Sequence, residues 1–137
     1  MISILIVDDE LFNRRLLRYA LEPYAKCTTA DNGKEGFIVY RDSLDQGERF
    51  DVVLLDIMMP VMDGFECLEL IREFEQERQV LDDDRVKVLI VTTHADRDNV
   101  LRAKQANVDG FIVKPINRKH LLGEIRNCGI NLAEIAD

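Results

Sequence analysis

The chain of 137 residues has the length of one domain, and its 47% hydrophobic and 32% charged content is that of an ordinary soluble globular protein. The net charge of −8 argues against general nucleic-acid binding, because a phosphate backbone would repel it. No apolar stretch approaches the ~20 residues of a membrane span, and no basic secretory segment precedes the first strand. Three widely spaced cysteines, Cys27, Cys67 and Cys128, form no CxxC pair and are interpreted as reduced core or boundary residues. We expect a cytoplasmic domain with neither membrane nor nucleic acid as direct partner.

Strand-like runs alternate with helical patterns along the chain. Strands are predicted at residues 2–7, 26–30, 51–55, 88–91 and 111–113, the second of them less apolar and therefore at a sheet edge. Helices are predicted between Asp9 and Pro23, after the Asn32-Gly33 turn, from about Asp63, and over residues 97–106 and 117–127. Five β-α units with near-continuous apolar strands predict a doubly wound, five-stranded parallel α/β sheet with helices on both faces.

The first predicted helix has apolar residues along two neighbouring stripes. One stripe consists of Phe12, Leu16 and Tyr19, and beside it lie Leu17, Ala20 and Leu21. This spacing of three and four residues is typical of an amphipathic helix.

Four of the five predicted strands end at a residue that can do chemistry. The first strand runs into Asp8 and Asp9, the third into Asp56, the fourth into Thr92 and the fifth into Lys114. Parallel strands end at one edge of their sheet, where open α/β folds bind ligands. Three carboxylates, a hydroxyl and an ammonium are therefore expected to converge in one cleft.

Each of these residues alone has a simpler interpretation. Asp8 and Asp9 could begin a helix, where acidic side chains favour the positive end of the helix dipole. Asp56 could open a turn, Thr92 could be an ordinary strand residue, and Lys114 could be surface charge, although lysine is unusual after a buried strand. None of these alternatives explains acids at two separate strand ends, so the joint pattern favours a site.

The expected cleft has the components of phosphoryl transfer. Three carboxylates in a confined site cannot all stay ionised without a counter-charge, and hard oxygen ligands completed by waters are what Mg²⁺ prefers. A metal, the ammonium of Lys114 and the hydroxyl of Thr92 can together stabilise phosphoryl oxygens. Asp56 can then act as nucleophile and form an acyl phosphate.

Taken together, these motifs resemble the receiver domain of two-component response regulators. The matching residues, in the family's order, are Asp8-Asp9, Leu54-Leu55-Asp56-Ile57-Met58-Met59-Pro60, Met62-Asp63-Gly64, Thr92 and Lys114-Pro115. The resemblance covers residues 2 to about 128 and implies a flavodoxin-like sheet with strand order 2-1-3-4-5. It also implies a chemotaxis-regulator-like, stand-alone domain over residues 1–128, followed by a C-terminal tail of residues 129–137.

The resemblance implies a role for each residue of the site. Asp56 would accept a phosphoryl group from a sensor histidine kinase or phosphotransfer protein, with Mg²⁺ as cofactor. Asp9, Asp56 and the main-chain carbonyl of Met58 would ligate Mg²⁺, and Asp8 would act largely through a bound water. Lys114 would pair first with the carboxylate and then with the phosphoryl oxygens, and a cis Lys114-Pro115 bond would aim it.

The resemblance also implies a switch. Thr92 would move to bond the phosphoryl group, and Phe111, which on its own reads as a core aromatic, would swing inward behind it. The surface of the fourth helix, fifth strand and fifth helix would then change for a downstream protein target. Phosphorylation could also lead two copies of the chain to form a homodimer, and this alternative stays open.

Three residues near the site depart from the family pattern or tune it. Thr93 stands where receivers usually have alanine or glycine, and its bulk is predicted to slow access by small phosphodonors and by hydrolytic water. Met58 and His94 occupy the positions where the family tunes phosphoryl lifetime. Met58 offers no polar group to orient a water whereas His94 could, so the direction of their joint effect stays open. His94 and His120 are expected to be partly exposed and not to ligate a metal.

Two segments lie outside the matched motifs. Residues 73–85 form a longer link than usual, in which the third helix is predicted to continue by a turn or two and break near Asp82, with Asp82, Asp83 and Asp84 in a solvated loop. Gly129 is predicted to stop the last helix. The tail offers Ile130, Leu132 and Ile135 as packing residues that cap the domain or mediate self-association.

Competing functions are weakened by particular residues. A Mg²⁺-dependent aspartyl-phosphate phosphohydrolase would need an acid two residues after Asp56, where this chain has Met58. A flavin-binding module would need a neutral phosphate loop after the first strand, where Asp8, Asp9 and Glu10 repel phosphate. A receiver-like domain that signals without phosphorylation remains an alternative. A phospho-acceptor switch rather than an enzyme is therefore the preferred interpretation.

Overall fold

Five parallel strands form one sheet in the order β2-β1-β3-β4-β5 in the computed structural model, which describes residues 1–132. The strands are β1 (Ile2–Val7), β2 (Ala25–Ala30), β3 (Val52–Leu55), β4 (Lys87–Thr92) and β5 (Gly110–Val113). The helices are α1 (Leu11–Leu21), α2 (Gly33–Asp45), α3 (Gly64–Glu77), α4 (Arg97–Gln105) and α5 (Arg118–Asn127). The predicted fold class and strand order are confirmed, with β2 at an edge.

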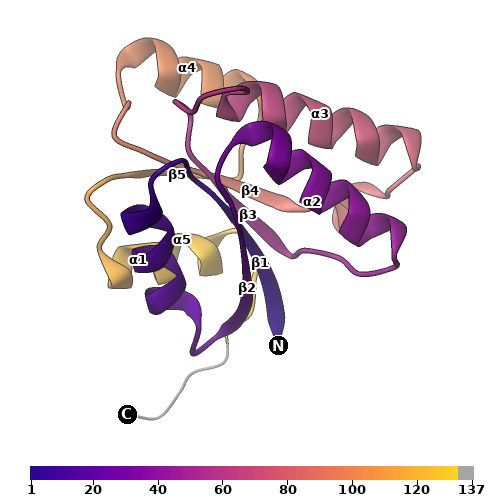
Figure 1. The fold of residues 1–137 in the computed structure, drawn as a ribbon, viewed down its shortest axis with the longest axis horizontal. Helices are drawn as coiled ribbons and strands as arrows, with labels where there is room; N and C mark the ends of the chain where they lie inside the picture. Colours follow the sequence, from indigo (N-terminus) through magenta and orange to yellow (C-terminus); the bar gives the residue numbers. More distant parts are fainter. Residues whose placement is uncertain (133–137) are drawn as a thin grey trace.

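Two separate cores form on the two faces of the sheet, because successive residues of a strand point in opposite directions. Ile4 and Ile6 of β1 pack in one core with residues of α1 and α5, whereas Leu5 and Val7 pack in the other with residues of α2, α3 and α4. The same division of the helices is visible in Figure 1. Coverage on both faces explains why the strands read as continuous apolar runs.

Only one of the two apolar stripes of α1 meets the sheet. Leu17, Ala20 and Leu21 are buried, whereas the side chains of Phe12 and Tyr19 are 73% and 81% exposed. Leu16, between them, is 38% exposed. The stripes are neighbours on the helix, and a period of 3.6 residues does not say which of them faces inward. The exposed stripe of Phe12, Leu16 and Tyr19 is called the α1 face below.

Side-chain caps begin four of the five helices where the sequence predicts them. In α2, α3, α4 and α5 the residue before the helix accepts a hydrogen bond from the amide three residues on; these caps are Asn32, Asp63, Asp96 and Asn117. Such caps satisfy amides that have no partner within the helix. At α1 the side chain of Glu10 does not form such a cap. The backbone amide of Glu10 instead donates a hydrogen bond to Asp8 Oδ1.

The link between α3 and β4 differs from the prediction in where the helix ends. α3 stops at Glu77, five residues before Asp82, and Gln79 adopts a positive φ of 57°. A short 3₁₀ turn, Asp82–Asp84, follows, and its residues are exposed as expected. Residues 78–85 are called the α3–β4 segment below. They form one ion pair with the end of α2, Arg78–Asp45, and one with the α2–β3 connection, Arg49–Asp84.

The described end of the chain packs on the domain. Gly129 has a φ of +92° and ends α5 as predicted. Beyond it, Ile130 packs partly buried against the α1–α5 core, and Leu132 is only 3% exposed. Ile135, the third apolar residue predicted to pack, lies outside the described residues. Within residues 1–132, no helix is long and apolar enough to cross a membrane.

The three cysteines are free thiols. Cys27 and Cys67 are buried and Cys128 is half-buried. Burial raises the pKa of the Cys67 thiol to about 12, so this side chain stays protonated and unreactive. The burial of the three cysteines agrees with the prediction that they are reduced residues of the core or its boundary.

Gly64 allows α3 to begin directly against β3. Its amide donates to the Ile57 carbonyl at 2.8 Å, and a Cβ there would lie 2.1 Å from the Asp56 carbonyl oxygen. Gly64→Ala is expected to lower the free energy of unfolding by about 1–3 kcal/mol, because neither backbone can yield cheaply. Urea denaturation measures the loss. Gly123→Ala in α5, where a Cβ meets nothing within 4 Å, is the control; an equal or smaller loss for Gly64→Ala would contradict this account.

Candidate functional site

The carboxyl ends of β1, β3, β4 and β5 meet at one edge of the sheet and surround an open cleft. Its lining residues come from the loops after these strands and from the start of α1: Asp9, Glu10, Asn13, Asp56, Met58, Thr93, His94, Lys114 and Pro115. Asp8 lies beneath the cleft and is 1% exposed. The sheet topology thus brings together side chains that are up to 106 positions apart in sequence.

Lys114 joins the acids of two strands. Its Nζ lies 2.6 Å from Asp8 Oδ2 and 3.1 Å from Asp56 Oδ2. The side chains of Lys114, Asp8 and Asp56 are 7%, 2% and 9% exposed, so these ion pairs are largely removed from water. Burial alone would lower the pKa of Lys114, but the hydrogen bonds and charges of the two carboxylates raise it above its ordinary value. Lys114 is therefore a fixed positive charge at neutral pH.

Backbone amides fix the second carboxylate oxygen of each buried acid. Asp8 Oδ1 accepts from the Glu10 amide at 2.9 Å, and Asp56 Oδ1 accepts from the Ile57 amide at 2.8 Å. Arg14 Nη1 donates to the Asp8 carbonyl at 2.8 Å, which ties α1 to the end of β1. Both carboxylates thus have one oxygen towards Lys114 and one towards the backbone.

The three acids fit a small hard cation. One oxygen each of Asp8, Asp9 and Asp56 lies within 4.8 Å of the others. Asp9 is exposed and forms no ion pair within residues 1–132, so three carboxylates face one ammonium and leave two negative charges over. Carboxylate oxygens in a cleft open to water are a suitable donor set for Mg²⁺. A role at the start of α1 explains the hydrogen bond from the Glu10 amide to Asp8 Oδ1, but it does not explain the contact of Lys114 with Asp8 Oδ2.

Besides Asp8, two predicted residues do not line the cleft. Thr92 is fully buried at the end of β4, and its Oγ1 accepts from the His94 amide at 3.0 Å. Phe111 is half-buried in β5 and packs against the core on the α2–α4 side of the sheet. The predicted neighbours Met58, Thr93 and His94 do line the cleft, and all three are exposed. His120 is also exposed, as expected, 3.9 Å from Glu124.

Several contributors were missed from the sequence. Glu10 and Asn13 line the cleft, Arg14 contacts the Asp8 carbonyl, and the Ile57 amide holds Asp56. Helical spacing from Asp9 would have placed Asn13 one turn into α1, facing the same end of the sheet. The amide of Ile57 carries no sequence signal. The expected cis Lys114-Pro115 bond is present.

Comparisons with known proteins agree with this geometry. The family model of the response regulator receiver domain matches residues 4–126. The chain is 32% identical over 124 residues to the chemotaxis protein CheY of Halobacterium salinarum, covering 90% of this chain and 92% of that protein. It is 30% identical to the hybrid signal transduction histidine kinase I of Dictyostelium discoideum, covering 93% of this chain but 7% of the kinase.

A solved structure shows the same architecture. A chain of the CheX-CheY-BeF3-Mg+2 complex of Borrelia burgdorferi superposes with a TM-score of 0.79 at 28% identity, over 95% of this chain and 90% of that one. The chain therefore belongs to the response regulator receiver family. It is a signalling domain of two-component systems with the acidic pocket typical of the family, and not an enzyme with a substrate of its own.

Removing the ammonium should expose how much the acids depend on it. Lys114→Met leaves Asp8 and Asp56 buried without a cationic partner, so we expect a loss of about 3–5 kcal/mol in unfolding free energy at pH 7. Because the folded-state pKa of Lys114 is raised, its contribution is complete below the ordinary value of 10.5 and is lost only above it. The difference from wild type should therefore stay constant between pH 7 and 9 in urea titrations.

The exposed Lys34 of α2 provides the matched control. Lys34→Met is expected to change the unfolding free energy by no more than about 0.5 kcal/mol. Equal losses for the two variants would show that the buried pairs do not stabilise the site.

Proposed function

We propose that Asp56 accepts a phosphoryl group from the phosphohistidine of a sensor histidine kinase or phosphotransfer protein, in a reaction that requires Mg²⁺. The observation that supports this most directly is the placement of Asp56. Its carboxylate is held at both oxygens, by Lys114 and the Ile57 amide, beside Asp8 and Asp9 and at the floor of an open cleft. A nucleophile fixed in this way needs little reorganisation before attack.

The transfer exchanges one bond for another. A carboxylate oxygen of Asp56 forms a bond to phosphorus as the bond from phosphorus to the histidine nitrogen breaks, and the imidazole leaves with the bonding electrons. Lys114, 3.1 Å from Asp56, is close enough to follow the negative charge onto the phosphoryl oxygens. The product is an aspartyl phosphate.

Mg²⁺, when bound, would neutralise charge on the acids and on the phosphoryl oxygens. Asp9 and Asp56 would ligate it directly, Asp8 through a water, and the carbonyl of Met58 would complete the protein ligands. The donor set described above supports this assignment. The similar CheX-CheY complex of Borrelia burgdorferi, which includes BeF3 and Mg+2, supports it further.

The switch would use residues that the cleft leaves aside. Thr92 lies directly beneath the cleft, with its hydroxyl turned to the His94 amide, and would rotate towards a new phosphoryl group. Phe111, half-buried on the neighbouring strand, would follow into the space behind it. The surface of α4, β5 and α5, which exposes Val100, Leu101 and Val113, would then differ for a downstream protein.

The first test is the intact mass of the protein after incubation with acetyl phosphate, with and without Mg²⁺. Wild type is expected to gain one phosphoryl group only with Mg²⁺, and Asp56→Asn none. Kinase-dependent transfer is measured in parallel with phosphorylated histidine kinases. An adduct that persists in Asp56→Asn would contradict the assignment, and no adduct from any donor would favour signalling without phosphorylation.

Thr93 is proposed to limit access to Asp56. It is exposed at the cleft mouth, between the buried Thr92 and the exposed His94. Thr93→Ala is expected to increase the rates of phosphorylation by acetyl phosphate and of spontaneous dephosphorylation severalfold, because it removes bulk and a hydroxyl from the path. Stopped-flow and mass measurements give the two rates. Rates equal to those of wild type would contradict the proposal.

The α1 face is proposed to receive the phosphodonor protein. Any protein that brings a phosphohistidine to Asp56 must cover the cleft rim, and the rim includes Glu10 and Asn13 at the start of α1. The strongly exposed Phe12 is the neighbour of Asn13 in sequence, and Tyr19 extends the exposed apolar surface along the same helix. An aromatic anchor beside a polar site is typical of protein interfaces.

Phe12→Ala should therefore separate protein donors from small ones. Transfer from a cognate kinase is expected to slow at least tenfold, whereas phosphorylation by acetyl phosphate stays within twofold of wild type. Leu81→Ala, which removes an exposed apolar side chain remote from the cleft, serves as control. Equal effects of Phe12→Ala on both donors would place its role in the site itself instead of in docking.

A further inference from the structure

A second cavity opens at the opposite edge of the sheet from Asp56, where β4 and β5 begin. Its lining comes from α3, the α3–β4 segment, the first residues of β4 and the α4–β5 turn: Arg72, Asp82, Arg85, Val86, Lys87, Ala106, Asn107 and Asp109. The cavity has a volume of about 330 Å³, within the range of small-molecule sites. Two of its lining residues, Asp82 and Arg85, belong to the α3–β4 segment.

Arg72 forms the floor of this cavity and is held rigidly. Its Nη1 donates to Glu75 Oε1 at 2.6 Å and to the Val86 carbonyl at 2.9 Å. Glu75 is itself fully buried and accepts from the Val86 amide and the Tyr40 hydroxyl, both at 2.8 Å. Burial and the neighbouring Glu75 raise the pKa of Tyr40, so its hydroxyl remains a donor. The guanidinium is therefore oriented before any ligand arrives.

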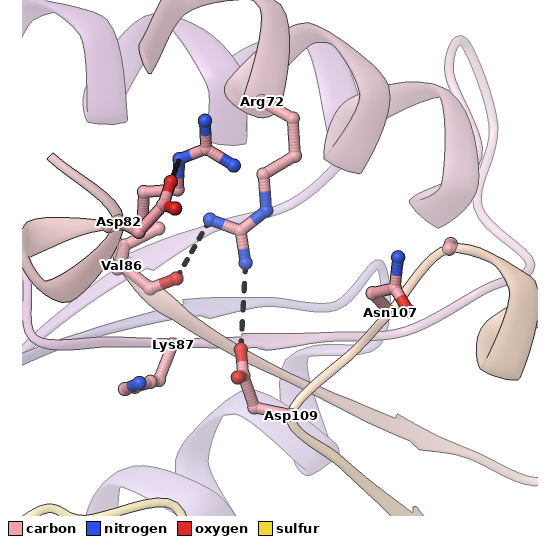
Figure 2. A pocket seen from close by; sticks show the side chains of 8 residues that line it. Arg72, Asp82, Val86, Lys87, Asn107 and Asp109 are labelled. Atoms are coloured by element: carbon pink, nitrogen blue, oxygen red, sulfur yellow. Dashed lines mark hydrogen bonds and ion pairs between the residues drawn. The ribbon is translucent and has the colours of Figure 1, made fainter. Parts of the chain in front are cut away.

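The second terminal nitrogen of the Arg72 guanidinium, Nη2, makes only a weak contact. Nη2 lies 3.5 Å from Asp109 Oδ2, the outer limit of a hydrogen bond, and that oxygen already accepts from the Val88 amide at 2.8 Å. Figure 2 shows Arg72 reaching from α3 between Val86 and Asp109. A stronger acceptor in the cavity could bind this nitrogen without breaking the contacts to Glu75 and Val86.

Two further cations line the rim with donors to spare. Arg85 Nε lies 3.4 Å from Asp82 Oδ1 but makes no hydrogen bond, although that atom is shielded from water. Within residues 1–132 the ammonium of Lys87 makes neither an ion pair nor a hydrogen bond, and the side chain of Arg85 donates no hydrogen bond beyond its ion pair with Asp82. Asp82 and Asp109 are each already shared with an arginine.

We propose that this cavity binds the oxyanion of a small polar molecule, a phosphate or carboxylate group held between Arg85, Lys87 and Nη2 of Arg72. The buried Glu75 neutralises the charge of Arg72. The preference for an oxyanion therefore comes from the free hydrogen-bond donors and not from an excess of positive charge. An oxyanion only accepts hydrogen bonds, and guanidinium groups match it in two-pronged geometry. Val86 and Ala106 supply the only apolar side chains of the lining, so a polar ligand fits and a hydrophobic one does not.

The test is a two-dimensional NMR titration of the ¹⁵N-labelled full chain without Mg²⁺, at constant ionic strength. Inorganic phosphate and succinate are added in separate series to distinguish the two kinds of oxyanion. Saturable shifts are expected at the amides of Val86, Lys87, Asn107 and Asp109 with at least one of them, unchanged in Asp56→Asn. This last variant separates the cavity from the phosphorylation site.

Variants decide whether the named cations are the ligands. Arg85→Gln and Lys87→Gln are each expected to weaken binding at least tenfold, whereas Lys104→Gln on the exposed side of α4 leaves it within twofold. Lys87 makes no ion pair with the described residues, so Lys87→Gln remains informative if Arg85→Gln releases the α3–β4 segment. Shifts that do not saturate, that centre on the Asp56 cleft, or that survive in Lys87→Gln would overturn the proposal.

Discussion

The ammonium of Lys114 between Asp8 and Asp56 is the interaction on which the rest of the site depends. Two buried carboxylates at neighbouring strand ends would repel one another strongly without it, because burial weakens screening by water. The sheet order makes the contact feasible: β5, which presents Lys114, is separated from β3 by β4 alone. The side chain therefore reaches over the end of β4, above the buried Thr92.

One ammonium cannot balance three acids, and that imbalance connects structure to function. With Asp8 and Asp56 paired to Lys114, the exposed Asp9 remains as the acid most open to a second cation. Lys114 supplies one positive charge, and a metal bound at the remaining acids would supply a second. Both would stabilise the negative charge of a phosphoryl group. The opposite sheet edge is built differently, with Arg72, Arg85 and Lys87 around a cavity that the α3–β4 segment helps to line.

Much of the fold and of the acidic cleft could be predicted because both follow from where apolar runs stop. Asp8, Asp56 and Lys114 each end such a run, and parallel topology alone brings them together. The orientation of α1 could not be predicted, since both of its stripes satisfy the same period. The direction of the Thr92 hydroxyl, which is set by the His94 amide, could not be predicted either. The same holds for Arg72, whose role depends on Glu75 of its own helix and on Asp109 from the distant α4–β5 turn.

The most direct test of the charge balance is the Mg²⁺ affinity of wild type, Asp9→Asn and Asp31→Asn, measured by calorimetry and by the rise in thermal stability with metal concentration. Asp31 is an exposed acid just beyond β2, at the same sheet edge but outside the cleft. One Mg²⁺ is expected to bind per wild-type chain, at least tenfold more weakly in Asp9→Asn and with unchanged affinity in Asp31→Asn. Equal affinity in all three proteins, or no binding by wild type, would contradict this expectation.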